Sequence, residues 1–117
     1  MHARSMLGRR GEDAACDLYR RLGYRVVERN YRAGRGEVDV VARRGDTVVF
    51  CEVKTRRSDE WGVPAEAVDR GKQARLRKLA AAWLAERRPG YVDVRFDVVS
   101  VIVRGDRADV THVADAF

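Results

Sequence analysis

The stretch GEVDVVARRGDTVVFCEVKTR, residues 36–56, decides the fold that this sequence predicts. It contains two runs rich in valine and other strand-forming residues, 37–43 and 47–55. Gly45 and Asp46 stand between the runs, and a Gly-Asp pair at the centre of a two-residue loop is a hairpin signal. We therefore expect an antiparallel β-hairpin that turns at these two residues.

The register of this hairpin follows from the two-residue loop. Opposed residues then have numbers that sum to 91, which places Asp39 opposite Glu52 and Glu37 opposite Lys54. Opposed residues share a face, as do alternate residues of one strand, so all four side chains are expected on one face. Three carboxylates and one ammonium would gather there, whereas a three-residue loop would split them between the faces.

This group of side chains suits a divalent cation, which relieves the repulsion between closely spaced carboxylates. Mg²⁺ prefers oxygen ligands and commonly uses one or two protein carboxylates together with substrate phosphate. Asp39 and Glu52 meet that requirement, and Lys54 is placed to orient an attacking water and stabilise charge on a phosphoryl oxygen. A structural network of ion pairs is the alternative, although burying two additional acids for one lysine brings no obvious stability.

Composition limits the function classes that remain. The 117 residues are 45% apolar and 36% charged, as expected for one small domain spanning residues 1–117. A net charge of +6 favours a partner that carries phosphates or another anionic surface. The two cysteines form no CxxC pair, and no apolar run is long enough for export or membrane insertion, which favours a cytoplasmic protein. His2 and His112 lie near the ends, where residues are often mobile, so we expect no histidine-based metal site or triad.

Apolar periodicity and turn residues predict the other elements of the fold. They are helices over residues 5–22 and from the N-cap Asp69 to about residue 88, and strands over 24–32, 92–103 and 108–113. The order helix, three strands, helix, two strands predicts an α/β fold in which helices flank a mixed sheet. Pro64 can begin a helical turn, and Trp61 is expected to pack in the ordinary way rather than stack on a base.

Several segments together resemble the YraN-like family of small bacterial proteins, which are predicted endonucleases. They are GRRGEDAA (8–15), ERNYR (28–32), GEVDVV (36–41), FCEVKTR (50–56), the helix containing Lys72, and RFDVVSV (95–101). The pattern of Asp39, a turn and then Glu52-x-Lys54 is similar to the core motif of the PD-(D/E)xK nuclease superfamily. The proline of that motif is absent here, because Val38 precedes Asp39. The resemblance spans nearly the whole chain. It implies a restriction-endonuclease-like mixed sheet, hydrolysis of phosphodiester bonds in DNA with Mg²⁺ or Mn²⁺, and similarity to archaeal Holliday junction resolvases.

The resemblance also implies roles for particular residues. Asp39, Glu52 and Lys54 fall on the core motif, and Glu12 falls where the resolvase-like branch uses an acid of the first helix. The implied catalytic residues are therefore Asp39, Glu52, Lys54 and Glu12, and the implied metal ligands are Asp39, Glu52 and Glu12. Glu37, paired opposite Lys54, is expected to hold that ammonium in place.

The basic residues near the two motif strands are the candidate nucleic-acid contacts. Arg35 and Arg56 border the strands, and Lys72 lies in the first turn of a helix, where a cation opposes the helix dipole. Each could equally be a solvated surface charge. Arg95 and Asp97 alternate on one strand face and are expected to pair with neighbouring residues. The alternatives to a nuclease are a non-catalytic nucleic-acid-binding module with a relict site and a protein whose basic surface binds an acidic protein partner.

Overall fold

The computed structural model describes residues 5–59 and 68–117, and their elements follow the predicted order. The elements are α1 (Met6–Arg21), β1 (Arg25–Ala33), β2 (Gly36–Arg44), β3 (Thr47–Arg57), α2 (Arg70–Arg87), β4 (Asp93–Arg104) and β5 (Arg107–Val113). Ser5 and the predicted Asp69 cap the two helices through their side-chain oxygens. The expectations for Trp61 and Pro64 lie outside the described residues.

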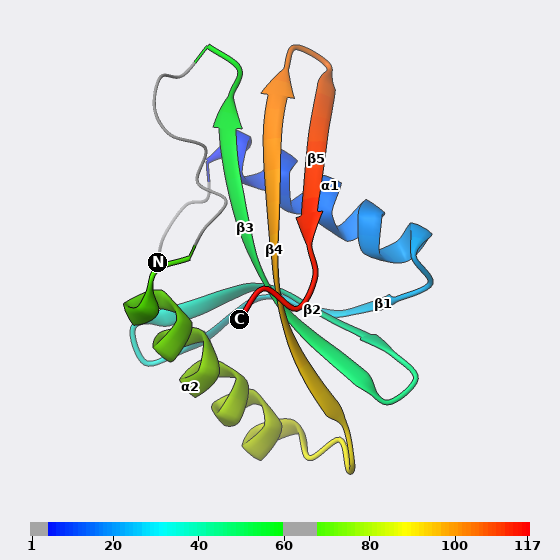
Figure 1. Ribbon diagram of the computed structural model, residues 1–117, viewed down its shortest axis with the longest axis vertical. Helices are drawn as coiled ribbons and strands as arrows, with labels where there is room; N and C mark the ends of the chain where they lie inside the picture. The colour runs from blue at the N-terminus through cyan, green and yellow to red at the C-terminus, as the bar shows by residue number, and fades with distance from the viewer. Residues whose placement is uncertain (1–4, 60–67) are drawn as a thin grey trace.

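The strands form one mixed sheet in the order β1-β2-β3-β4-β5 (Figure 1). β3 and β4 are parallel, and the other neighbouring strands are antiparallel. A parallel pair needs a crossover connection, and α2 lies in the segment between these two strands. The predicted α/β fold class is confirmed, and the five-stranded mixed sheet with its two helices is consistent with a restriction-endonuclease-like sheet.

Each helix covers its own face of the sheet with its own apolar cluster. The cluster under α1 includes Tyr19 and Val49, and the cluster under α2 includes Phe50 and Trp83. Phe50 and Trp83 meet edge to face, with ring centres 5.6 Å apart. Neighbouring residues of β3 therefore serve opposite faces, as strand geometry requires. Within the described residues, neither helix is long and apolar enough to cross a membrane.

The predicted hairpin is confirmed from its turn as far as the pair Val40 and Cys51. The next predicted pair, Asp39 and Glu52, is not part of the ladder. The Asp39 side chain takes the place of backbone pairing, because its Oδ2 accepts a hydrogen bond of 2.7 Å from the backbone N–H of Val53. The regular ladder between β2 and β3 therefore ends where the candidate site begins.

Two further details of the predicted register are wrong for the same reason. Glu37 does not pair opposite Lys54, and instead forms an ion pair of 2.9 Å with Arg32 on β1. Strand alternation would place Val38 and Val40 on one face, but Val38 joins the cluster under α2 and Val40 the cluster under α1. Simple alternation along β2 thus fails around Asp39.

Candidate functional site

Glu12 reaches the sheet because α1 approaches β3 very closely at the preceding residue. A Cβ atom at Gly11 would overlap the side chain of Thr55, so only glycine fits there. Glu12 is only 3% exposed, and its carboxylate lies 3.5 Å from Arg29. The same guanidinium pairs with the exposed Asp13 at 2.8 Å. The close packing of α1 therefore buries one acid of the first helix beside β2.

Three carboxylates meet at this point. One oxygen each of Glu12, Glu37 and Asp39 lies within 4.8 Å of the other two. Glu12 and Glu37 each have an arginine partner, whereas no cation in the described ranges lies within ion-pair distance of Asp39. Burial, and then the negative charge of Glu52, raise the pKa of Asp39 to about 7, despite the hydrogen bond from Val53. Asp39 is therefore the acid whose charge is least compensated.

Glu52 lies beside this group and faces two lysines. Its Oε1 is 3.9 Å from the Nζ of Lys54 and 4.0 Å from the Nζ of Lys72. Burial raises the pKa of Glu52, although both ammonium groups oppose this effect. Burial and the neighbouring Lys72 lower the pKa of Lys54. The structure thus gathers all four residues of the implied catalytic set, but Glu37 rather than Glu52 completes the closest trio with Glu12 and Asp39.

A groove of about 140 Å³ opens beside these acids, between the start of β2 and the first half of α2. Its lining residues are Arg35, Gly36, Glu37, Glu52, Lys72, Arg75, Leu76 and Leu79. Two of the predicted phosphate contacts, Arg35 and Lys72, are among them, whereas Arg56 is not. Sequence reasoning missed Arg75, although it stands three residues after Lys72 and so on the same helix face.

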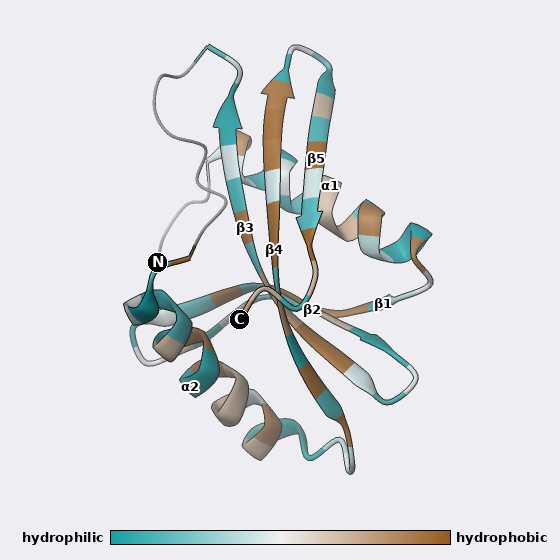
Figure 2. Cartoon of the chain, viewed as in Figure 1, coloured by the Kyte–Doolittle hydropathy of each residue, from teal (hydrophilic) through white to brown (hydrophobic). Residues whose placement is uncertain are grey.

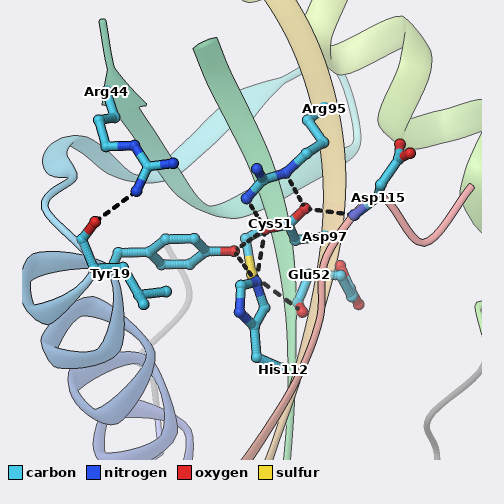
Figure 3. Close-up of polar contacts among 9 residues, drawn as sticks. Tyr19, Arg44, Cys51, Glu52, Arg95, Asp97, His112 and Asp115 are labelled. Atoms are coloured by element: carbon cyan, nitrogen blue, oxygen red, sulfur yellow. Dashed lines mark hydrogen bonds and ion pairs between the residues drawn. The ribbon is translucent and has the colours of Figure 1, made fainter.

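A second polar cluster lies inside the fold, centred on the fully buried Asp97 (Figure 3). Arg95 donates two hydrogen bonds of 2.8 Å to its carboxylate, so the expected pairing with neighbouring residues is confirmed, and these two residues pair with each other. The Tyr19 hydroxyl lies at 2.7 Å, the His112 Nε2 at 2.8 Å and the backbone N–H of Asp115 at 3.0 Å. The expectation that His112 is mobile is wrong, because β5 holds it in this network. The cluster joins α1, β4 and β5, which gives it a structural role.

The donor set at Glu12, Glu37 and Asp39 fits a hard divalent cation. Carboxylate oxygens are the ligands that Mg²⁺ and Mn²⁺ prefer in proteins. The raised pKa of Asp39 means that the cluster by itself keeps a proton near neutral pH, and a bound cation would compensate the same charge. These three residues are the ones that could hold the metal, with Glu52 beside them.

Comparisons with known proteins agree on one family. The model of the uncharacterised protein family UPF0102 matches residues 11–101. A UPF0102 protein of Dictyoglomus thermophilum is 42% identical to this chain, and the match covers 95% of this chain and 96% of the relative. A UPF0102 protein of Geobacter sulfurreducens is 46% identical to this chain, and the match covers 99% of this chain and 91% of the relative. A UPF0102 protein of Rhodococcus opacus is also 46% identical, and the match covers 95% of this chain and 95% of the relative. The matched segment contains every acid of the candidate site.

Proposed function

This chain belongs to the UPF0102 family, and we propose that it is a metal-dependent nuclease that hydrolyses phosphodiester bonds in DNA. The observation that carries the proposal is the meeting of Glu12, Glu37 and Asp39, where Asp39 has no described cationic partner. Glu52 and Lys54 stand directly beside them. The resemblance of the two motif strands to the PD-(D/E)xK superfamily supports the same activity.

The proposed roles divide between acids and cations. The trio Glu12, Glu37 and Asp39 would hold Mg²⁺ or Mn²⁺, which supplies Lewis-acid polarisation of a phosphoryl oxygen and eases deprotonation of water. Lys54 is half-buried next to the acids, so its ammonium can orient the attacking water and stabilise negative charge on the phosphate. Lys72 lies on the groove wall, where it can hold a substrate phosphate.

The substrate class follows from charge and size. A net charge of +6 attracts a polyanion, and the cations of the groove lie beside the acids rather than on a remote surface. A chain of 117 residues has little surface left to read base edges once it houses a site, which favours selection by DNA structure, such as branches. A homodimer would match the two-fold symmetry of a junction. Two free, buried cysteines suit a reducing cytoplasm.

Cleavage assays test this proposal. Purified protein is incubated with labelled branched, nicked and plain duplex DNA, with Mg²⁺, with Mn²⁺ or with EDTA. We expect cutting only with metal, and a loss of at least about a hundredfold in Asp39→Ala and Lys54→Ala. Asp17→Ala removes an exposed acid on the far end of α1 and serves as the matched control with unchanged cutting. Cutting in EDTA, or full activity in Asp39→Ala, contradicts the proposal.

A non-catalytic nucleic-acid-binding module with a relict site is the second candidate. One observation favours it: Lys54 and Lys72 already face Glu52, so this acid is neutralised without any metal. Such a module would bind DNA in a salt-dependent way, keep that binding in Asp39→Ala, and show no turnover with any metal. The cleavage assay therefore separates the two candidates.

A further inference from the structure

A second groove continues from the first, away from the acids. It has a volume of about 370 Å³, within the range of roughly 300–1,000 Å³ that is usual for small-ligand pockets. Its lining residues are Ala33, Arg35, Gly36, Arg75, Lys78 and Leu79, and we call it the outer groove. Four of these residues also line the groove beside the acids, so the two form one continuous path.

The floor of the outer groove is apolar because α2 packs directly on the backbone of β2. A Cβ atom at Gly36 would lie 2.9 Å from the Cδ1 of Leu79, so any larger residue would displace this leucine. Leu79 is buried from the other side by the core cluster, and Ala33 completes the floor. An apolar floor of this kind suits an aromatic ring system more than it suits a hydrated ion.

The rim, in contrast, is cationic. In the ranges 5–59 and 68–117, no carboxylate lies within ion-pair distance of Arg35, Arg75 or Lys78. Lys72, Arg75 and Lys78 follow one another at intervals of three residues, so they line one face of α2. This first half of α2 is markedly hydrophilic (Figure 2). The rim therefore offers several positive charges that the described protein does not itself neutralise.

An apolar floor with a cationic rim is complementary to a nucleotide. Phosphates would contact the rim, and a base would lie on Leu79, with the Arg35 or Arg75 guanidinium available for stacking. A base within a duplex has both faces covered by its neighbours, so only an unpaired base can enter. A duplex could contact only the rim.

We propose that the outer groove binds an unpaired nucleotide of a nucleic-acid strand whose phosphates continue toward Glu52 and Asp39. This rests on the proposed function, and it deepens it by naming the substrate class as DNA with a single-stranded segment beside the scissile bond. Arg35, Arg75 and Lys78 hold the backbone, and Leu79 supports the base.

Fluorescence anisotropy in EDTA tests this binding without cleavage. The probes are a labelled single strand of about ten nucleotides and the duplex of the same sequence. We expect the wild-type protein to bind the single strand about tenfold more tightly than the duplex. The variant Arg75→Gln/Lys78→Gln should lose about tenfold in affinity for the single strand, and its slope of log K against log salt should fall by about 1.4. The control Arg21→Gln/Arg25→Gln removes two exposed charges away from the groove and should change neither the preference nor the slope appreciably.

Competition distinguishes a base from a phosphate alone. Deoxyadenosine monophosphate should displace the labelled strand at lower concentration than inorganic phosphate does. Equal binding of strand and duplex, equal potency of the two competitors, or groove and control variants that behave alike would overturn the inference. Cleavage is measured separately. If the wild type cuts DNA only with metal and Asp39→Ala does not cut, the nuclease proposal stands even if the binding tests of the outer groove fail. Conversely, binding of the single strand can be confirmed even if no cutting is observed.

Discussion

Replacing Asp39 by asparagine should stabilise the protein at alkaline pH in the absence of metal. Burial and nearby acids raise the pKa of this carboxyl from 3.8 to about 7. Between these pH values the folded protein keeps the proton and the unfolded chain has lost it. Unfolding then releases a proton, so the free energy of unfolding falls as pH rises through this window and stays low above it.

The magnitude follows from the same difference. One pKa unit corresponds to about 1.4 kcal/mol, so ionised Asp39 costs the folded state about 4 kcal/mol at pH 8. Asparagine removes this cost, and its amide oxygen can still accept the hydrogen bond from Val53. Allowing for relaxation of the site, we expect Asp39→Asn to gain about 2 to 4 kcal/mol over the wild type at pH 8, and little near pH 4.

Urea unfolding followed by tryptophan fluorescence measures this difference, in EDTA at both pH values. The control Asp17→Asn changes an exposed acid whose partner, Arg20, lies 3.6 Å away, and it should shift stability by less than about 1 kcal/mol. Saturating Mn²⁺ should stabilise the wild type by about 3 kcal/mol at a hundredfold excess over the dissociation constant, and should leave Asp39→Asn nearly unchanged. Equal destabilisation of Asp39→Asn at both pH values in EDTA would refute this reasoning, because it would mean that the carboxylate is ionised and well compensated in the folded state.

Three further predictions concern the frame that holds the site. Gly11→Ala should lower the free energy of unfolding by about 1 to 3 kcal/mol, measured by thermal unfolding, because the new Cβ overlaps Thr55. The control Gly71→Ala, on the exposed first turn of α2, should be nearly neutral or stabilising. Equal effects of the two substitutions would contradict the close packing at Gly11. Asp97→Asn should lower the free energy of unfolding by about 3 to 5 kcal/mol at pH 7. Burial alone would raise the pKa of Asp97, but its hydrogen bonds outweigh burial and lower the pKa, so the loss of stability should shrink as pH falls below about 4. A loss that does not depend on pH would contradict this prediction. The two buried cysteines should react with a thiol reagent only after unfolding, and rapid labelling of the native protein would show that one is exposed.

The sequence was sufficient to predict the order of elements and most of the hairpin. A Gly-Asp turn between two valine-rich runs fixes the register, because a shift of one residue would expose an apolar face. The same rule failed at Asp39, where a side chain replaces backbone pairing. Periodicity counts residues along a strand, and it contains no information about where a side chain will interrupt the ladder.

Contacts between distant segments were the other limit. Tyr19 and Asp97 lie 78 positions apart, and nothing in the local pattern of either predicts their hydrogen bond. Glu37 was expected to support Lys54, but its place in the trio with Glu12 depends on how α1 packs against the sheet. Arg75 could have been found from its spacing to Lys72, since both share a helix face.

Anomalous scattering from a crystal soaked in Mn²⁺ tests the central claim most directly, because it locates the metal without requiring turnover. We expect an anomalous peak within about 2.0 to 2.4 Å of carboxylate oxygens of Asp39 and of Glu12 or Glu37, and no such peak in Asp39→Asn crystals. A well-occupied Mn²⁺ elsewhere, with the three carboxylates bare at saturating metal, would contradict it.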